Sequence, residues 1–377
     1  MPTYFARQIE PTWAHRMRVL LLFVVLIQFA AVDVARADSV FKVGVTTRDY
    51  FPSEPYDWRS AKARVLRAMI WYPASADARE ASQWVGPPIL PFFSAGNAAL
   101  DAAPAAGAQY PLVLLSHGNG GTASGLAWLG TALAAHGFIV VAVNHPGNNA
   151  TEDTTVDGFS LFWLRTVDLN AVTSAVLGDK TFGSMIDPER IGAAGHSFGG
   201  YTVIAAAGGI ADPALLEAFC RSPAADALCK QSGASDMRNK RLALLSSDPD
   251  FRRRYSEASK SYRNERIRAV FAMAPGPGPV FTQDSLAKVS IPVAMVIGSD
   301  DEVTPPASGA ESLAKAIPHA TLRIFPHGGH FVFLNACTTV GRLIMRVPCG
   351  DPNGTDRQAV HAEAIKIALD FFNANLR

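Results

Sequence analysis

The chain has 377 residues, of which 49% are hydrophobic and 18% are charged, and its formal net charge is +1. A chain of this length and apolar content can bury one large core or two modest ones. The near-neutral charge argues against a nucleic-acid partner. The sequence also has no glycine-lysine phosphate loop and no Gly-x-Gly-x-x-Gly opening a helix after a strand, and we expect no cofactor.

The N-terminal segment has the pattern of a secretory signal peptide. Two arginines precede a short apolar run, and Ala35 and Ala37 form an A-x-A arrangement. We expect residues 1–37 to be the signal and residues 38–377 to be a secreted or periplasmic domain. An uncleaved anchor is the alternative, but the run is shorter than the roughly 20 residues of a spanning helix. We therefore expect no stable membrane anchor after cleavage.

Apolar segments of strand length alternate with helical patterns along the rest of the chain. Two early segments, 41–52 and 64–75, alternate in polarity and favour antiparallel edge strands. Later segments are continuously apolar; they lie at 111–118, 138–147, 190–197, 267–276, 291–301 and 320–330. Continuous apolar strands separated by helices indicate a mostly parallel sheet with helices on both faces.

Helical patterns lie between and after these strands. They cover about 125–136, 157–177, the residues after Ser197, and about 355–375 at the C-terminus. Within the second helix, Phe159 and Trp163 can belong to the core or line an acyl pocket, and the core is the favoured interpretation. Segment 95–109, rich in alanine and glycine, is interpreted as a surface loop.

Residues 209–266 interrupt the alternation of strands and helices. They are helical and polar, and residues 230–268 hold eleven Lys or Arg but only five Asp or Glu. Two interpretations are open: a solvated helical face, or a cap over the site that attracts anionic substrates. In both cases we expect a helical insertion within one domain.

The four cysteines fall into two close pairs, Cys220 with Cys229 and Cys337 with Cys349. Four cysteines allow three connectivities, and pairing within each local pair is the simplest in an oxidising compartment. No Cys-x-x-Cys is present, so we expect neither a zinc site nor a redox motif, and no metal is assigned.

A glycine-rich stretch, "GAAGHSFGGY", places Ser197 between an apolar strand and a helix of small residues. In a tight strand–Gly-x-Ser-x-Gly–helix turn the serine hydroxyl is lifted above the strand ends, and glycines avoid clashes. The alternative is a glycine-rich turn without chemistry. The strand before and the helix after favour a nucleophile.

A serine nucleophile needs a histidine base and a carboxylate that orients the base, both later in the chain. His327 and His330 follow the last apolar strand, and we favour His330 because two preceding glycines let the loop fold back. Asp300 and Asp301 end the strand before, and either can face the histidine.

The reaction also needs two backbone N–H groups for the oxyanion. We expect one from Phe198, directly after Ser197, and one from Asn119 in "SHGNGG" at 116–121. A phosphate-cradling turn is the alternative for this loop, but it lacks the expected lysine. The segment 144–154 also ends a strand and either lines the site or forms a polar turn.

Five motifs together resemble the α/β-hydrolase superfamily: "LLSHGNGG", "NHPGNN", "GHSFGGYT", "GSDDEVTPP" and "GGHFVFLNAC". The resemblance is in particular to bacterial predicted dienelactone hydrolases, which are similar to platelet-activating-factor acetylhydrolases. It implies hydrolysis of a small-molecule ester through an acyl-enzyme, without a cofactor. It also implies an acid just before a polar-apolar-x-Pro stretch, which selects Asp301 over Asp300.

The chain departs from these families in two ways. Dienelactone hydrolases use a cysteine nucleophile where this chain has Ser197, so their name does not indicate the substrate. The acetylhydrolases carry their acid one strand earlier, where this chain has "APGPGPVF" without a carboxylate. We expect a serine carboxylic-ester hydrolase. A peptidase or acyltransferase on the same residues, or a binding protein on a hydrolase fold, is the alternative.

Overall fold

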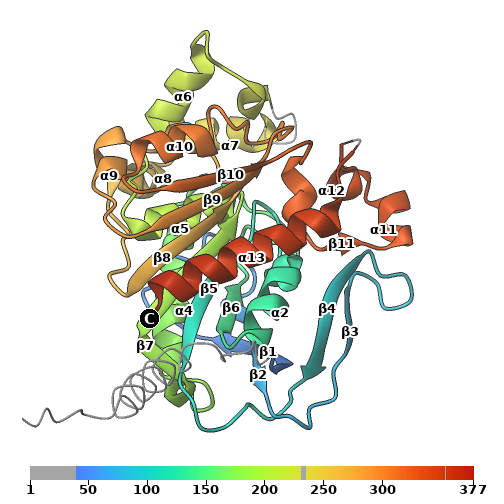
Figure 1. The fold of residues 1–377 in the computed structure, drawn as a ribbon. Coiled ribbons are helices and arrows are strands. Elements are labelled where there is room, and N and C mark those ends of the chain that lie inside the picture. Colours follow the sequence, from blue (N-terminus) through green and yellow to red (C-terminus); the bar gives the residue numbers. More distant parts are fainter. Residues whose placement is uncertain (1–39, 231–234, 353) are drawn as a thin grey trace, which may run out of the picture. The chain divides into compact units, whose positions relative to one another are not determined.

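The computed structural model describes residues 40–230, 235–352 and 354–377, and within them the chain forms an 11-stranded mixed sheet (Figure 1). The predicted signal peptide lies outside these residues. The strand order is β10-β9-β8-β7-β5-β6-β2-β1-β4-β11, with β3 beside β4. The strands are β1 (Lys42–Tyr50), β2 (Leu66–Ala74), β3 (Ala81–Val85), β4 (Phe93–Leu100), β5 (Tyr110–Ser116), β6 (Ile139–Val143), β7 (Ile186–His196), β8 (Ile267–Met273), β9 (Val293–Gly298), β10 (Thr321–Phe325) and β11 (Ala336–Cys337).

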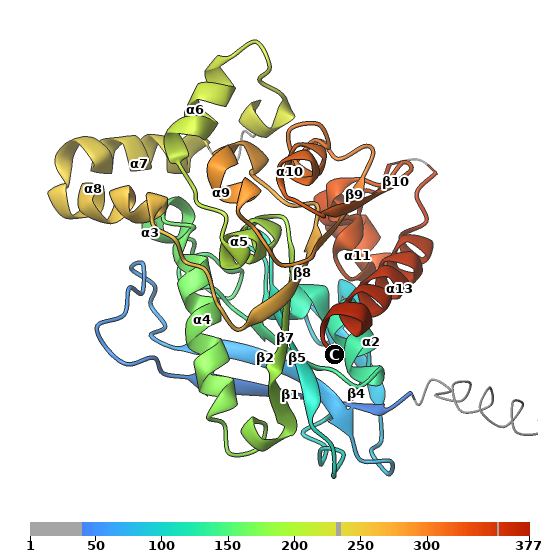
Figure 2. The ribbon, with the colours of Figure 1, turned by 60° about the vertical axis from the view of Figure 1, so that its left-hand side comes forward.

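Helices cover both faces of this sheet, with α4 and α5 on one face and α2 and α13 on the other (Figure 2). The predicted fold class is therefore confirmed. None of the helices in the described ranges is long and apolar enough to cross a membrane. The helices are α2 (Ala127–Ala135), α3 (Val156–Ser160), α4 (Leu164–Leu177), α5 (Phe198–Ala207), α6 (Pro213–Arg221), α7 (Ser235–Ser247), α8 (Pro249–Ser256), α9 (Gln283–Ala287), α10 (Ala310–Ala316), α11 (Thr339–Ile344), α12 (Arg346–Cys349) and α13 (Arg357–Asn375).

The six continuously apolar segments form the parallel part of the sheet, β5 to β10. Leu114 on β5 is paired with Val141 on β6 and with Ala193 on β7, both in parallel register. All three residues are fully buried, as expected for a sheet covered on both faces. Parallel strands end at the same edge, so the loops after β5, β7, β9 and β10 meet there.

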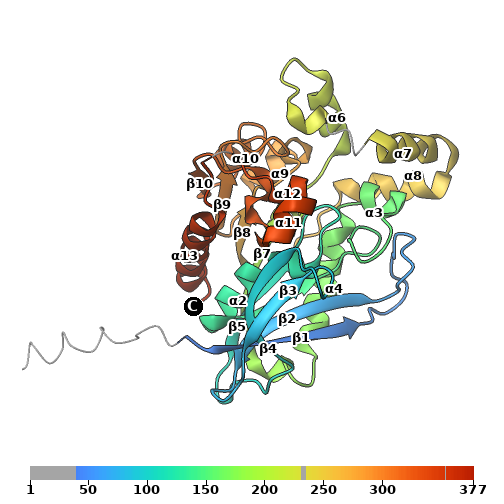
Figure 3. The same ribbon diagram turned by 90° about the vertical axis from the view of Figure 1, so that its right-hand side faces the viewer.

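The two early segments pair antiparallel, as predicted, with β1 beside β2 and β2 beside β6. The expectation that they are edge strands is wrong, because β4 and β11 extend the sheet beyond β1. The prediction of a loop at 95–109 is wrong for residues 95–100, which belong to β4. This strand runs parallel to β1 and antiparallel to β3 (Figure 3). Alanine and glycine have low strand propensity, but Ala95 and Ala98 are buried here, and pairing with two strands overrides local preference.

The predicted helix at 157–177 is divided into α3 and α4, with the non-helical residues 161–163 between them. Trp163 is the last residue of this break and is fully buried. Its ring packs edge-on against Phe162 and Tyr255. Trp163 is therefore a core residue, whereas Phe159 is half-buried.

Both predicted disulfide pairings are confirmed. Cys220 is bonded to Cys229 within the segment that carries α6, α7 and α8, and Cys337 on β11 is bonded to Cys349 on α12. In Figures 1 and 2 the helices α6, α7 and α8 lie beyond the edge of the sheet at which β7 passes into α5. This is also the edge that carries the candidate site.

Candidate active site

Ser197 lies between β7 and α5 in a strained backbone conformation. Its φ and ψ angles are 58° and −120°, and it is the N-cap residue of α5. Positive φ is uncommon for a residue with a Cβ and marks a turn held by its surroundings. A Cβ on Gly195 would lie 2.2 Å from the Gly199 carbonyl oxygen, so the turn requires glycine at this position. The turn leaves Ser197 at the strand's carboxyl end, 7% exposed.

Asp301 and His330 face each other at the neighbouring strand ends. Asp301 follows β9, and His330 begins the 3-10 helix η7 (His330–Phe333) after β10. His330 Nδ1 lies 2.8 Å from Asp301 Oδ2, and both side chains are almost completely buried. Since an ionised carboxylate only accepts, Nδ1 carries the proton and Nε2 is left as the ring's acceptor.

Further donors hold the Asp301 carboxylate in place. The backbone N–H groups of Val303 and Thr304 lie 2.9 and 2.7 Å from Oδ1, and the Thr304 hydroxyl lies 3.0 Å from Oδ2. Burial raises the pKa of Asp301, whereas the facing His330 and the backbone hydrogen bonds lower it. The lowering outweighs the raising, so the pKa of Asp301 lies below its ordinary value. The sequence analysis missed Thr304, although a threonine three residues after an acid is typical of a side-chain-capped turn.

The alternative candidates, Asp300 and His327, are exposed. Asp300 Oδ2 lies 3.7 Å from His327 Nδ1, and the two side chains are 44% and 65% exposed. The Ser299 hydroxyl donates to Asp300 Oδ1 at 2.6 Å. The structure thus brings together Asp301 and His330 and leaves the other pair in solvent.

His196 connects the Ser197 turn to the His330 loop. Its Nε2 donates to the His330 carbonyl oxygen at 3.0 Å, and the two ring centroids are 4.7 Å apart. Burial lowers the pKa of His196 to about 3, so the ring is neutral. The sequence analysis assigned no role to His196, because a histidine inside the nucleophile motif carries no signal of its own.

The loop at 116–121 follows β5 and lies beside Ser197. A Cβ on Gly118 would lie 3.1 Å from the Ser197 Cβ. The Gly120 N–H donates to Asn148 Oδ1 at 3.1 Å, and Asn148 Nδ2 donates to Asn119 Oδ1 at 2.8 Å. The predicted polar segment 144–154, which contains Asn148, therefore supports this loop.

The two N–H groups predicted for an oxyanion are those of Asn119 and Phe198. Neither has a hydrogen-bond acceptor in the described part of the chain. Phe198 is the first residue of α5, where N–H groups have no partner within the helix. An oxyanion site requires N–H groups that are free to bind the developing negative charge.

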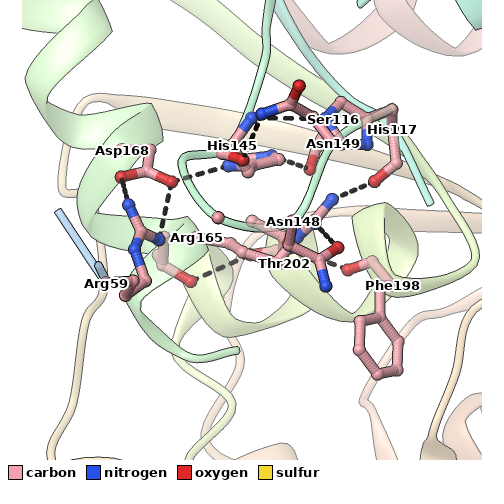
Figure 4. A network of polar contacts seen from close by, with 12 residues as sticks. Arg59, Ser116, His117, His145, Asn148, Asn149, Arg165, Asp168, Phe198 and Thr202 are labelled. Carbon is pink, nitrogen blue, oxygen red and sulfur yellow. Dashed lines mark hydrogen bonds and ion pairs between the residues drawn. The ribbon is translucent and has the colours of Figure 1, made fainter. Parts of the chain in front are cut away.

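Ser116, His145 and Asp168 form a chain of hydrogen bonds that is completely buried and is called the buried line below (Figure 4). Ser116 Oγ lies 2.9 Å from His145 Nε2, and His145 Nδ1 lies 2.8 Å from Asp168 Oδ2. Arg59 binds Asp168 through two hydrogen bonds of 2.9 and 2.6 Å. Burial, together with the charges of two arginines, lowers the pKa of His145 and keeps the ring neutral. No local motif connects these residues, and the sequence analysis did not find them.

In the described ranges, no group of three or more His, Cys, Asp or Glu could hold a metal ion.

Most charged side chains of the segment 230–268 form ion pairs. Arg254 lies 2.8 Å from both Asp57 and Asp157, which ties α8 to the main sheet. The other pairs are Lys240–Asp236, Arg241–Glu217, Arg253–Asp250, Arg253–Glu257, Lys260–Glu257, Arg263–Glu265 and Arg268–Glu189. This pairing favours the solvated face over an anion-attracting surface.

Comparison with protein families and known sequences gives matches over parts of the chain. The alpha/beta hydrolase family model matches residues 112–341, and the platelet-activating factor acetylhydrolase isoform II model matches residues 58–158. Lipase 1 of Moraxella sp. (strain TA144) is 39% identical over 75 residues, 20% of each chain. Cutinase est1 of Thermobifida alba is 36% identical over 93 residues, 24% of this chain and 28% of that one. The chain thus matches less than a third of either relative.

A solved structure has the same fold over nearly the whole chain. The ferulic acid esterase from Streptomyces cinnamoneus superposes with a TM-score of 0.59 at 19% identity, covering 91% of this chain and 92% of that one. Since the family model spans more than half of the residues, the chain belongs to the alpha/beta hydrolase family. Within that family it resembles the platelet-activating factor acetylhydrolases, as the motifs predicted.

Proposed function

We propose that the protein is an exported serine carboxylic-ester hydrolase that acts on small-molecule esters. The observation that carries the proposal is the buried Asp301–His330 hydrogen bond beside a serine held in a strained turn. The sequence similarity to a lipase and a cutinase supports ester bonds as the target. The A-x-A signal at 1–37 and the two disulfides support export.

The reaction runs in two stages on these residues. Ser197 Oγ attacks the ester carbonyl while His330 Nε2 takes its proton, and Asp301 stabilises the imidazolium. The N–H groups of Asn119 and Phe198 stabilise the tetrahedral oxyanion. His330 then protonates the leaving alcohol, which leaves an acyl-enzyme. A water, deprotonated by His330, attacks the acyl carbon and releases the acid and Ser197.

The segment 209–266 is proposed as a helical cap on this domain. Its helices α6, α7 and α8 lie beyond the edge that carries Ser197 (Figures 1 and 2). Because its arginines are mainly ion-paired, we propose that this cap does not attract anionic substrates.

The proposal is tested with a panel of p-nitrophenyl esters of increasing acyl length, assayed beside peptide p-nitroanilides. We expect ester turnover, no comparable amide turnover, and covalent labelling by a fluorophosphonate at Ser197. The matched control is Ser197→Ala, which keeps the fold. Amide cleavage faster than ester cleavage would favour a peptidase, and failure of the probe to label Ser197 would remove the proposed nucleophile.

A further inference from the structure

Arg165 is a buried cation in the first turn of α4, and its side chain is fully buried. In the described part of the chain no carboxylate lies within ion-pair distance of its guanidinium. Such a charge is costly to bury unless hydrogen bonds compensate for the lost water. Burial lowers the pKa of Arg165 to about 9, with Asp168 opposing and Arg59 adding to the effect, so the cation persists at neutral pH.

Two acceptors of Arg165 lie in or against the loop at 116–121: the His117 carbonyl belongs to this loop, and the Asn148 side chain supports it from the segment 144–154 (Figure 4). Arg165 Nη2 donates to the His117 carbonyl oxygen, and Nη1 donates to Asn148 Oδ1 at 3.1 Å. The same Asn148 oxygen accepts from the Gly120 N–H, and its amide nitrogen donates to the Asn119 side chain. Arg165 thereby holds the chain on both sides of Asn119.

The third acceptor of Arg165 is the Thr202 hydroxyl, which is in turn hydrogen-bonded to Phe198, the residue after Ser197. Arg165 Nε donates to Thr202 Oγ1 at 3.3 Å, and the Thr202 hydroxyl donates to the Phe198 carbonyl oxygen at 2.7 Å. Figure 4 shows this chain of contacts reaching the first turn of α5. One guanidinium thus connects the two segments whose N–H groups stand unpaired beside Ser197.

The planar guanidinium suits this task because its N–H groups point in several fixed directions at once. A lysine is a single point charge and cannot hold three divergent acceptors in one geometry. Binding of an acidic substrate is excluded as the role, because the Arg165 side chain has no exposed surface.

We infer that Arg165 is a positioning residue that fixes the distance and direction of the Asn119 and Phe198 N–H groups. The inference rests on the proposed function, since it concerns the oxyanion of that reaction. Preorganised donors stabilise the transition state without reorganising during the reaction. Loss of the Arg165 hydrogen bonds to these two segments should therefore lower kcat and leave ground-state binding of the ester almost unchanged.

The test compares the wild type with Arg165→Gln, using active sites titrated by a fluorophosphonate. We expect kcat for a p-nitrophenyl ester to fall by about 10- to 100-fold, less than the 10²–10³ typical of losing an oxyanion donor outright. KM should stay within about threefold. The affinity for an alkyl trifluoromethyl ketone, whose serine adduct carries an oxyanion, should fall in parallel with kcat/KM. Arg165→Lys should recover only part of the loss.

Two further variants, called the arm variants, each remove one set of Arg165 contacts. Asn148→Ala removes the side chain that joins Arg165 to the loop at 116–121, and Thr202→Val removes the hydroxyl that joins Arg165 to α5. Each should lower kcat at least severalfold. Thr173→Val is the matched control, because Thr173 is a buried threonine of α4, the helix of Arg165, and its hydroxyl donates to the Leu169 carbonyl at 2.6 Å. It should keep the wild-type kcat. If Arg165→Gln does not fold, the two arm variants decide alone.

The outcomes separate the inference from the proposed function. Unchanged kcat per active site in Arg165→Gln, with only a lower Tm, would show a purely structural role and overturn the inference. Unchanged kcat in either arm variant would overturn the claim that Arg165 positions both segments. If the wild type shows no Ser197-dependent ester hydrolysis, the proposed function fails, and the inference fails with it.

Discussion

The residues proposed for catalysis and the buried line of Ser116, His145 and Asp168 have the same three residue types but differ in their surroundings. Among the residues proposed for catalysis, Asp301 bonds to His330 near a serine in a positive-φ turn. In the buried line, Ser116 ends a regular strand and bonds to His145 and through it to Asp168. The residue types are the same, so composition alone cannot identify the nucleophile.

Charge compensation is the main difference between the two sets of residues. Arg59 neutralises Asp168 with two hydrogen bonds, and the Tyr56 hydroxyl bonds to the same carboxylate. Asp301 has no arginine or lysine partner among the described residues and faces the ring of His330. A carboxylate already paired with an arginine gains little by stabilising an imidazolium, which suits the buried line to a static structural role.

The largest expected effect separates the two serines. Ser197→Ala should lower kcat for a short-chain p-nitrophenyl ester by roughly 10⁵ to 10⁶, because the nucleophile is lost. Ser116→Ala removes only a buried hydroxyl and should keep kcat within about tenfold, with a lower Tm. Steady-state kinetics on both folded variants checks this. Comparable losses in both would mean that the buried line takes part in the reaction.

The next effect separates the adjacent acids. Asp301→Asn should lower kcat by up to about 10⁴, since the amide cannot stabilise the His330 imidazolium. Asp300→Asn should cost less than about tenfold, because Asp300 is exposed and bonds to Ser299. The kinetics of both variants, with circular dichroism as a check on folding, decides the matter. A reversed order would make Asp300 the acid.

For the buried line the expected effect is on stability. Asp168→Asn leaves the fully buried Arg59 guanidinium without a counter-charge, which typically destabilises by about 3–5 kcal/mol. Urea unfolding of the variant should show this loss. Asp153→Asn breaks the exposed Lys62–Asp153 pair and should leave the midpoint unchanged. An unchanged midpoint for Asp168→Asn would contradict the structural role of this line.

The smallest effect is a pH dependence of stability from the buried histidines. Burial lowers the pKa of His145 in the folded state, so the unfolded chain binds its proton first as the pH falls. The stability is therefore complete above about pH 6.5 and decreases below it, by up to about 1.4 kcal/mol per pH unit for each such histidine.

Urea unfolding between pH 7 and pH 5 measures this slope in a range where carboxylates do not titrate appreciably. His145→Gln should make the slope shallower by about one proton. A slope that His145→Gln leaves unchanged would show that His145 is not held neutral by folding.

Local pattern was sufficient for much of the fold and for the candidate nucleophile. The apolar runs that became β5 to β10 and the glycine turn around Ser197 are encoded within a few residues each. The pairing of Cys220 with Cys229 is also local in the chain. Strand β4 was not predicted, because its alanines and glycine are in a strand only where neighbouring strands pair with them.

The parallel sheet and the glycine turn around Ser197 could be predicted from the sequence, because periodicity and glycine punctuation act over short distances. The family resemblance favoured Asp301 over Asp300, and the folded chain places Asp301 against His330, a contact that depends on side-chain direction at a strand end. Arg165 and Asp168, two residues of one helix without a motif, became visible only in the folded chain. Their roles arise from contacts between β5, β6, α4 and α5, and long-range packing leaves no periodic signal in the chain.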